Sequence, residues 1–225
     1  DPYSHLLLLK IVATVSAGAV FLTLIGIWGI ERGLTRQAEA SHTPFLEGLK
    51  EVWAEDKARK FTVFVFLSMT AYFMQELILE PYAGLVFGFS PGQSTSLSGA
   101  QNGGVFLGML CVGLACTGLK LGSLRSWVIC GCLGSALSLS AIAALGIDGS
   151  AAQLTAAVIA LGVFNGMFAV AAIGSMMSLA GTGRGAREGT RMGLWGAAQA
   201  IAAGFGGLFG AAAADGMRLW ITSAA

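Results

Sequence analysis

Long runs of apolar residues, separated by short polar segments, dominate the pattern along the chain. A helix that crosses a bilayer needs about 20 predominantly apolar residues. Six segments meet this requirement: Leu6–Ile30, Phe61–Phe89, Ala100–Leu119, Trp127–Ile147, Ala152–Ala180 and Met192–Ala214. The alternation with a period of two that a membrane barrel requires is absent, and lipid offers the backbone no hydrogen-bond partner. We therefore expect an all-α integral membrane protein with six transmembrane helices.

Basic residues are concentrated in the segments between alternate spans, and with six spans these segments share one side of the membrane. They are Arg32, Arg36, Lys50, Lys57, Arg59, Lys60, Lys120, Arg125, Arg184, Arg187 and Arg191. The segments expected on the opposite side, Ser90–Leu97 and Asp148–Ser150, contain no Lys or Arg. The positive-inside rule therefore predicts that the basic loops are cytoplasmic.

The first of these loops, residues 31–60, carries a helical pattern. Thr43 and Pro44 form a suitable N-cap and first helical position. Apolar residues then recur on one face, opposite a charged face. The apolar positions are Phe45, Leu46, Leu49, Val52 and Trp53, and the charged ones are Glu47, Lys50, Glu51 and Glu55. The pattern predicts an amphipathic helix, either on the membrane surface or packed under the bundle.

Composition agrees with a membrane location, because 55% of the 225 residues are hydrophobic and only 11% are charged. A soluble domain carries about a quarter charged residues. The net charge of +1 gives no global field for nucleic acid. Pairs of glycines four residues apart allow helix backbones to approach closely. The pairs are Gly104/Gly108, Gly162/Gly166 and Gly206/Gly210.

The second span is unusually polar. Tyr72, Glu76 and Glu80 are each four residues apart and lie along one helix face. A carboxylate at membrane depth costs about 2.5–3.5 kcal/mol on insertion scales. Two carboxylates on one face repel unless one of them is protonated or paired. Pro81 is expected to kink or end the helix beside Glu80.

This cluster predicts a site for proton coupling, for coordination of a ligand's cation or metal, or for docking of a partner's polar group. Alternatively, Glu80 lies at the periplasmic interface and caps the bundle. The other polar residues within spans are weaker candidates, because neutral amides often serve as interhelical hydrogen bonds worth about 0.6 kcal/mol. They are Gln101 and Asn102 at the start of the third span, Asn165 in the fifth, and Gln199 one turn after Trp195 in the sixth.

Enzymatic chemistry is not indicated. His5 and His42 lie outside the spans, and no Ser-His-Asp set, CxxC, Walker loop or HExxH pattern occurs. We therefore expect a protein that is not an enzyme and has no dedicated metal site.

Several segments together resemble the PucC/LhaA family, whose members are major-facilitator-like proteins of purple phototrophic bacteria implicated in assembling light-harvesting complexes. The resemblance is carried by Gln75–Gly84, Ser90–Thr95, Leu97–Gly104, Gly122–Trp127 and Gly193–Ala200. The sequence of these segments more closely resembles the LhaA branch, which serves the core antenna, than the PucC branch, which serves the peripheral antenna.

The resemblance implies that the six spans are helices six to eleven of a twelve-helix major-facilitator fold. Residues 1-30 would then be the last helix of the N-terminal half, 31-60 the loop between halves, and 61-225 an incomplete C-terminal half. We therefore expect the given chain to lack the beginning of the full protein. The stretch Gly118–Gly122 lacks the acidic residue of a transporter's gating motif, which favours a scaffold or chaperone over alternating access.

The resemblance also implies an assembly factor that holds antenna polypeptides and transiently handles bacteriochlorophyll. Glu76 and Glu80, with Gln75, would be oxygen ligands to the chlorin magnesium, directly or through water, or would accept a partner's hydrogen bond. The candidate pigment- or partner-binding residues are Tyr72, Gln75, Glu76, Glu80, Pro81, Gln101, Asn102, Asn165, Trp195 and Gln199.

Implied partners are antenna polypeptides, the reaction-centre complex or its assembly intermediates, and lipid of the bacterial inner, intracytoplasmic photosynthetic membrane. Two alternatives stay open. One is a proton-coupled secondary transporter in which Glu76 is the coupling carboxylate, and the other is a structural subunit of a photosynthetic complex.

Overall fold

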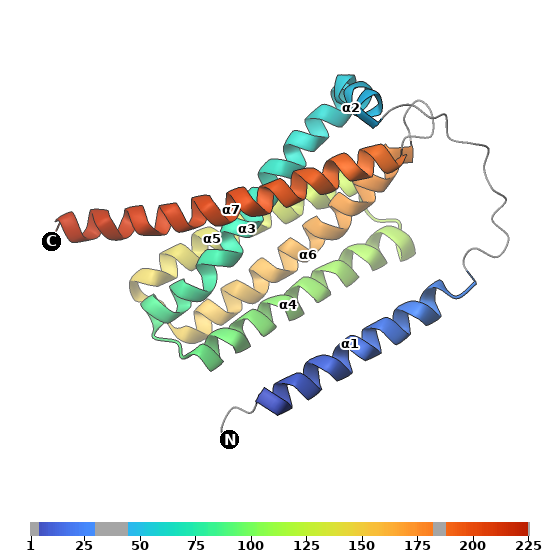
Figure 1. The fold of residues 1–225 in the computed structure, drawn as a ribbon. Helices are drawn as coiled ribbons and strands as arrows, with labels where there is room; N and C mark the ends of the chain where they lie inside the picture. The colour runs from blue at the N-terminus through green and yellow to red at the C-terminus, as the bar shows by residue number, and fades with distance from the viewer. Residues whose placement is uncertain (1–4, 30–44, 182–187, 225) are drawn as a thin grey trace. The chain divides into compact units, whose positions relative to one another are not determined.

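A computed structural model describes residues 5–29, 45–181 and 188–224, and the described part is all-helical (Figure 1). One unit, Asp1–His42, contains α1 (His5–Ile27), and the second, Thr43–Ala225, contains the other helices. These are α2 (Phe45–Ala54), α3 (Asp56–Phe87), α4 (Pro91–Gly113) with a π-helical turn η1 (Leu114–Gly118), α5 (Leu124–Asp148), α6 (Ala151–Gly181) and α7 (Glu188–Ala224).

Six helices are long and apolar enough to cross a membrane, namely α1, α3, α4 with η1, α5, α6 and α7. The predicted all-α class and the six spans are confirmed. The chain is that of a multi-pass membrane protein.

The start of α4 differs from the prediction. Ser90 caps the helix: its hydroxyl accepts a hydrogen bond from the amide of Gln93, and the Gln93 side chain accepts one from the amide of Ser90. Pro91 occupies the first turn, where a missing amide hydrogen costs nothing. The helix therefore begins at Pro91 and not at Ala100, and the loop predicted over Ser90–Leu97 shortens to a turn.

Pro81 does not end α3, so the prediction that the helix could end beside Glu80 is wrong. The helix continues through Pro81 to Phe87 and ends at Gly88, whose φ of 66° is the left-handed conformation that glycine adopts readily. Transmembrane helices tolerate an interior proline because neighbouring groups satisfy the freed carbonyl.

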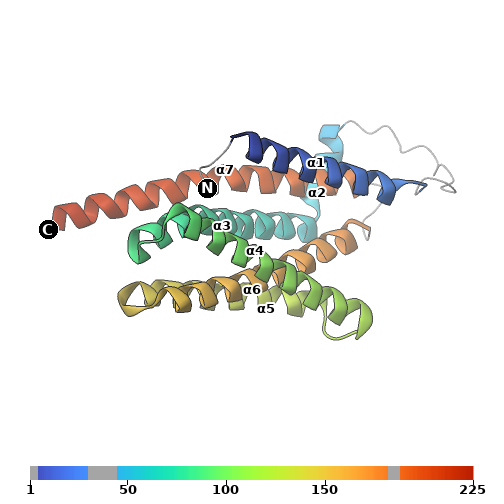
Figure 2. The same ribbon diagram turned by 90° about the horizontal axis from the view of Figure 1, so that it is seen from below.

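The bundle has two groups of helices. Helix α6 packs along both α4 and α5, while α3 packs along α7. Figure 2 shows α5 and α6 below α3 and α7, with α4 running obliquely from the level of α3 toward α5 and α6. Contacts between the groups, through α3 with α4 and α6 with α7, are sparser. We call the boundary between the α3–α7 pair and the α4–α5–α6 group the seam.

Glycines produce the close packing of α4 on α6, as the sequence predicts. A Cβ atom at Gly104 would lie 2.5 Å from the carbonyl oxygen of Ile159, and one at Gly108 would collide with the carbonyl of Val163. Gly162 and Gly166 face the α4 backbone in the same way. The α4–α6 contact is therefore made backbone to backbone. In α7, Gly206 similarly faces α3, whereas Gly210 has more room.

A buried arginine connects several helices at the end of the bundle that carries α2. The Arg191 side chain is 2% exposed, and one of its guanidinium nitrogens lies 2.6 Å from both carboxylate oxygens of Glu55. The other terminal nitrogen donates to the carbonyls of Leu179 and Ala180 at the end of α6. One side chain thereby joins α6 and α7 to the α2–α3 junction.

A helix, α2, occupies the segment with the amphipathic pattern, and it contacts α3 and α7. On its predicted apolar face Val52 is 1% exposed and Leu49 is half-buried, whereas Trp53 is exposed. The Thr43–Pro44 cap and the side chains of Phe45 and Leu46 lie outside the described residues.

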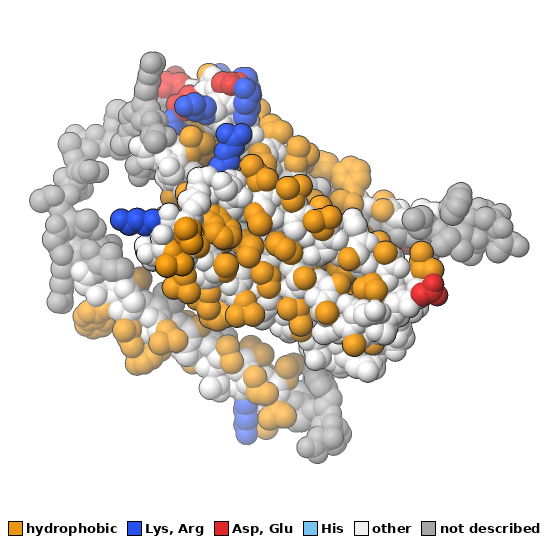
Figure 3. Space-filling view, turned by 180° about the vertical axis from the view of Figure 1, so that it is seen from behind, with side chains coloured by type: hydrophobic (Ala, Val, Ile, Leu, Met, Phe, Trp, Pro, Cys, Tyr) orange, Lys and Arg blue, Asp and Glu red, His pale blue; other side chains and the backbone are white. Residues whose placement is uncertain are grey.

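Charged residues gather at the end of the bundle that carries α2, and hydrophobic side chains cover most of the face seen in Figure 3. The described basic residues of α2, of the start of α3, and of the α4–α5 and α6–α7 connections share this end. Arg32, Arg36, Arg184, Arg187 and His42 lie outside the described residues. That this end is cytoplasmic stays a prediction.

Tyr82 closes the opposite end of the seam. Its hydroxyl donates to the carbonyl oxygen of Ile142 on α5 at 2.8 Å. Replacing Tyr82 by phenylalanine removes this bond alone, so we expect the free energy of unfolding to fall by about 1 kcal/mol. Unfolding of the full-length protein by SDS, followed by circular dichroism, measures this change. A Tyr72→Phe variant is the control, because no hydrogen bond of that hydroxyl is seen among the described residues; an equal loss there would contradict the assignment.

Candidate functional site

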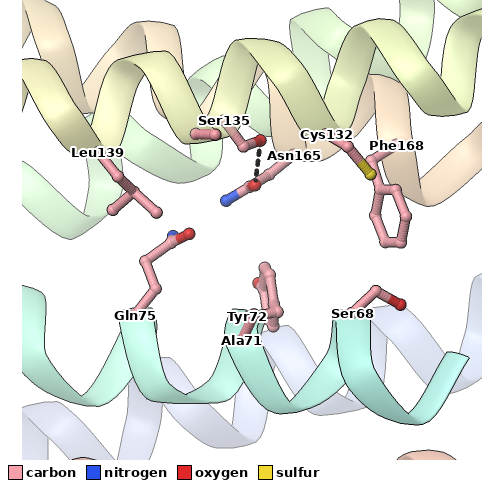
Figure 4. A pocket seen from close by; sticks show the side chains of 10 residues that line it. Ser68, Ala71, Tyr72, Gln75, Cys132, Ser135, Leu139, Asn165 and Phe168 are labelled. Carbon is pink, nitrogen blue, oxygen red and sulfur yellow. Dashed lines mark hydrogen bonds between the residues drawn. The ribbon is translucent and has the colours of Figure 1, made fainter. Parts of the chain in front are cut away.

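A cavity of about 210 Å³ lies at the seam, between the middle of α3 and the facing surfaces of α5 and α6 (Figure 4). It is lined by Ser68, Ala71, Tyr72, Gln75, Cys132, Ser135, Ala136, Leu139, Asn165 and Phe168. The cavity lies where α3 and α5 are not in close contact. Ala71, Cys132, Ala136 and Leu139 are exposed, so it opens sideways at the surface of the bundle.

Two amide side chains converge on this cavity. The Asn165 side-chain oxygen accepts a hydrogen bond from the Ser135 hydroxyl at 2.8 Å, while its nitrogen points into the space between α3 and α5 (Figure 4). Gln75 reaches from α3 into the same space. The Nδ2 atom of Asn165 and the Nε2 atom of Gln75 are buried without a hydrogen-bond partner among the described residues. A buried donor left unsatisfied costs about 1–3 kcal/mol, so both nitrogens favour an incoming acceptor.

The remaining wall is largely apolar. Phe168 and Leu139 provide its hydrophobic surface, and the half-buried ring of Tyr72 packs edge-on against Phe73. The Ser68 hydroxyl is engaged with the carbonyls of Phe64 and Val65 on its own helix. A small-molecule site is usually lined by apolar side chains with a few polar groups among them, and this cavity has that composition.

A second, smaller cavity continues along the seam toward α7. Ser68 and Phe168 line both cavities, and Gln199 contributes its side chain to the second one. The other walls are apolar residues of α3 and α6. Of the ten candidate residues, the structure thus places Tyr72, Gln75 and Asn165 in one cavity and Gln199 in the next.

The carboxylates of α3 are placed elsewhere. Glu76 and Glu80 are exposed, line neither cavity, and form no hydrogen bond or ion pair with the residues the structure describes; Pro81 is exposed as well. Gln75 and Glu76 are consecutive, and the turn of about 100° between them aims Gln75 inward and Glu76 outward.

The other candidates have positions that suit packing. Trp195 is 0% exposed, donates from its indole nitrogen to the Thr62 hydroxyl, and packs edge-on against Phe61. Gln101 is buried at the α4–α6 crossing, beyond the start of the helix, and Asn102 is exposed.

Sequence reasoning missed Ser135, Cys132 and Phe168. Of these three, Ser135 carries a signal in the sequence, because a hydroxyl within a span needs a partner, but Ser138 and Ser140 of the same span share that signal. Among the described residues, no group of three His, Cys, Asp or Glu side chains could hold a metal ion.

Fold and cavity together define the class: a multi-pass helical membrane protein with an amide-lined cavity that opens on the side of its bundle. The chain belongs to the PUCC protein family, whose model matches residues 1–225.

Known proteins support this membership. The chain is 68% identical over 226 residues to the protein named Bacteriochlorophyll synthase 44.5 kDa chain of Rhodobacter capsulatus, covering 100% of this chain and 52% of that protein. It is 30% identical to an uncharacterized protein of the puhA-bchM intergenic region of Rhodobacter capsulatus, covering 95% of this chain and 44% of the relative. It is also 27% identical to Protein PucC of Cereibacter sphaeroides, covering 91% and 44%. The chain spans about half the length of these curated relatives. No solved structure gives a significant match.

Proposed function

We propose that the full-length protein is an assembly factor for a bacterial light-harvesting antenna, and that it holds antenna polypeptides and delivers bacteriochlorophyll to them. Membership of the PUCC family across the whole chain is the observation that carries this proposal. The bacteriochlorophyll in the printed name of a relative agrees with a link to this pigment. The amide-lined cavity supplies a site of suitable chemistry within the membrane.

The finer assignments belong to the same proposal. The antenna is the core antenna around the reaction centre, the membrane is the intracytoplasmic photosynthetic membrane, and the basic loops face the cytoplasm. Residues 1-30 end the N-terminal half of a twelve-helix major-facilitator-like protein, 31-60 join the halves, and 61-225 belong to the C-terminal half.

The protein acts in this proposal without catalysing a reaction, although one relative is named a synthase chain. Among the described residues that line the first cavity, Tyr72 and Cys132 are the only ionisable ones, and the Glu76 carboxylate, one helical turn from Tyr72 on α3, lies outside the lining. Such a lining offers hydrogen bonds and apolar surface, which suit binding and release.

The two carboxylates of α3 take a separate role. Because Glu76 and Glu80 lie on the exposed face of the helix, they suit a partner outside the bundle better than a ligand inside it. We assign them to docking of an antenna polypeptide, whose hydrogen-bond donors they would accept. Ligation of a chlorin magnesium would have to take place on this outer surface.

A first test measures antenna yield in cells. Full-length protein carrying Gln75→Leu and Asn165→Leu removes both unpartnered donors while leaving the bulk of the side chains, so we expect antenna absorbance to fall several-fold. The Glu76→Ala variant tests the outer carboxylate, and we expect a reduction there too, because docking is weakened. Whole-membrane spectra measure antenna, and immunoblots measure the factor itself.

The control is Asn102→Leu, which removes an exposed amide outside the cavity. It should leave antenna yield unchanged. Normal antenna in the Gln75/Asn165 double variant, with the factor present at its usual level, would remove the cavity from the proposed function.

A proton-coupled transporter is the second candidate. The lack of a carboxylate in the lining of this cavity disfavours it, because Glu76 is exposed and does not line that space. Solute accumulation in vesicles that collapses with the proton gradient would establish transport. A structural subunit, by contrast, would be present stoichiometrically in the mature complex, whereas an assembly factor occurs only in intermediates.

A further inference from the structure

We infer that the cavity between α3, α5 and α6 binds the carbonyl-bearing edge of a lipid-soluble ring compound, through the side-chain N–H groups of Gln75 and Asn165. The inference concerns hydrogen bonding to the rim of the ligand and requires no bond to a metal. It rests on the proposed function only where it identifies that ligand as a chlorin pigment.

The orientation of Asn165 fixes the polarity of the site. Its side-chain oxygen is committed to the hydroxyl of Ser135, so its nitrogen is the atom that faces the cavity. The residue is 7% exposed, and its Nδ2 atom has no partner among the described residues. On the opposite wall the Nε2 atom of Gln75 is also buried without a partner among the described residues, while the Gln75 side-chain oxygen lies on the side toward Asn165 (Figure 4). The cavity therefore presents two hydrogen-bond donors that lack acceptors.

Charge narrows the class of ligand. The lining contains no Lys or Arg to balance an anion, and no Asp or Glu to balance a cation. Burying an unbalanced charge in an apolar surrounding is costly. A neutral acceptor satisfies the donors without that penalty, and the carbonyl oxygen of a ketone or ester is the common neutral acceptor on lipid-soluble molecules.

The size and shape of the cavity narrow the class of ligand further. At about 210 Å³ the cavity is smaller than the roughly 300–1,000 Å³ of sites that enclose a whole drug-sized ligand. It therefore takes one edge of a larger molecule, and the remainder extends through the side opening. Phe168 and Tyr72 offer aromatic surface to a flat ring.

Two sources of such a carbonyl occur in photosynthetic membranes, a chlorin and a quinone. Bacteriochlorophyll carries ketone and ester carbonyls on the rim of its ring, and a quinone carries two ring carbonyls. We assign the site to the chlorin because the proposed delivery of pigment requires a site that binds it. The quinone is a separate arm of the test.

The experiment uses purified full-length protein in lipid nanodiscs, titrated with bacteriochlorophyll a in one arm and ubiquinone-10 in the other. The protein should bind the pigment, and resonance Raman spectra should show a carbonyl stretch lowered by hydrogen bonding. The Gln75→Leu/Asn165→Leu variant should bind at least about tenfold more weakly, since each lost bond is worth roughly a factor of ten, and its carbonyl stretch should return to the unbonded frequency. Asn102→Leu is the matched control.

The cysteines give a second readout that does not depend on affinity. Cys132 lines this cavity, whereas Cys130 is exposed on the same helix and lies outside it. Variants that retain only one of these two thiols can be labelled with a lipid-soluble maleimide. Bound pigment should protect Cys132 and leave Cys130 reactive.

The outcomes are distinguishable. Undiminished pigment affinity in a folded double variant, or equal labelling of Cys132 with and without pigment, overturns the inference. So does a crosslink from Cys132 to another segment of the full-length chain, because that segment then fills the cavity. Quinone binding that needs both amides, without pigment binding, supports the carbonyl site and overturns its assignment to pigment. Loss of pigment binding with normal antenna in cells supports the site and contradicts the proposed function.

Discussion

Replacing Gly108 by leucine is expected to separate α4 from α6 and to lower the free energy of unfolding by about 3 kcal/mol, the upper end for an overpacked site. The position has no room, because even a Cβ atom would collide with the backbone of Val163. Backbone atoms cannot move aside as the end of a flexible side chain can. SDS unfolding of the full-length protein, followed by circular dichroism, measures the loss.

Gly103 provides the matched control for this prediction. It lies on the same helix, but a Cβ atom there meets nothing within 4 Å. Gly103→Leu should therefore cause no loss of stability, because the leucine meets no neighbour and favours a helix over glycine by up to about 1 kcal/mol. Equal losses at Gly103 and Gly108 would show that leucine acts through something other than the α4–α6 crossing.

A second large effect is expected at Arg191. The Arg191→Met variant keeps the apolar stem but removes the cation that joins Glu55 to the carbonyls of Leu179 and Ala180. Breaking a buried ion pair typically costs 3–5 kcal/mol. Because the Glu55 side chain is 41% exposed and can regain water, we expect the lower limit, about 3 kcal/mol. SDS unfolding measures it, and proteolysis within the α2–α3 junction should accelerate.

An exposed ion pair serves as the comparison. The Nζ atom of Lys60 lies 2.7 Å from the Oδ2 atom of Asp56, and the two side chains are 75% and 58% exposed. Such pairs contribute about 0–1 kcal/mol, so Lys60→Met should be nearly neutral. If Arg191→Met were equally neutral, the contact at the α2 end would contribute little to stability.

Much of this fold follows from the sequence because hydropathy alone determines where a chain can cross a bilayer. The spans found agree with those predicted to within a few residues at most ends. The start of α4 was misplaced because the run from Pro91 to Gly99 is polar, and its helicity depends on the cap at Ser90. Pro81 was expected to kink or end its helix because proline breaks helices in water, but α3 continues through Pro81 to Phe87, two residues from the end predicted at Phe89.

The candidate site was predictable only in part. Polarity within apolar spans identified Tyr72, Gln75 and Asn165, but sequence gives no angle of rotation for a helix that is apolar on all sides. For that reason the sequence could not show that Gln75 lines the cavity whereas Glu76 is exposed. The pairing of Ser135 with Asn165 joins two helices, and such a contact depends on tertiary packing.

The side opening between α3 and α5 has a consequence for how a ligand would be supplied. In the proposed function, a pigment that reaches the cavity from the flank of the bundle travels through lipid, so its availability is set by its mole fraction in the bilayer and not by its solubility in water. Pigments and quinones are confined to that thin layer, where modest affinity already gives high occupancy. Weak binding with rapid release is then sufficient, and for a protein that passes its cargo onward it is an advantage.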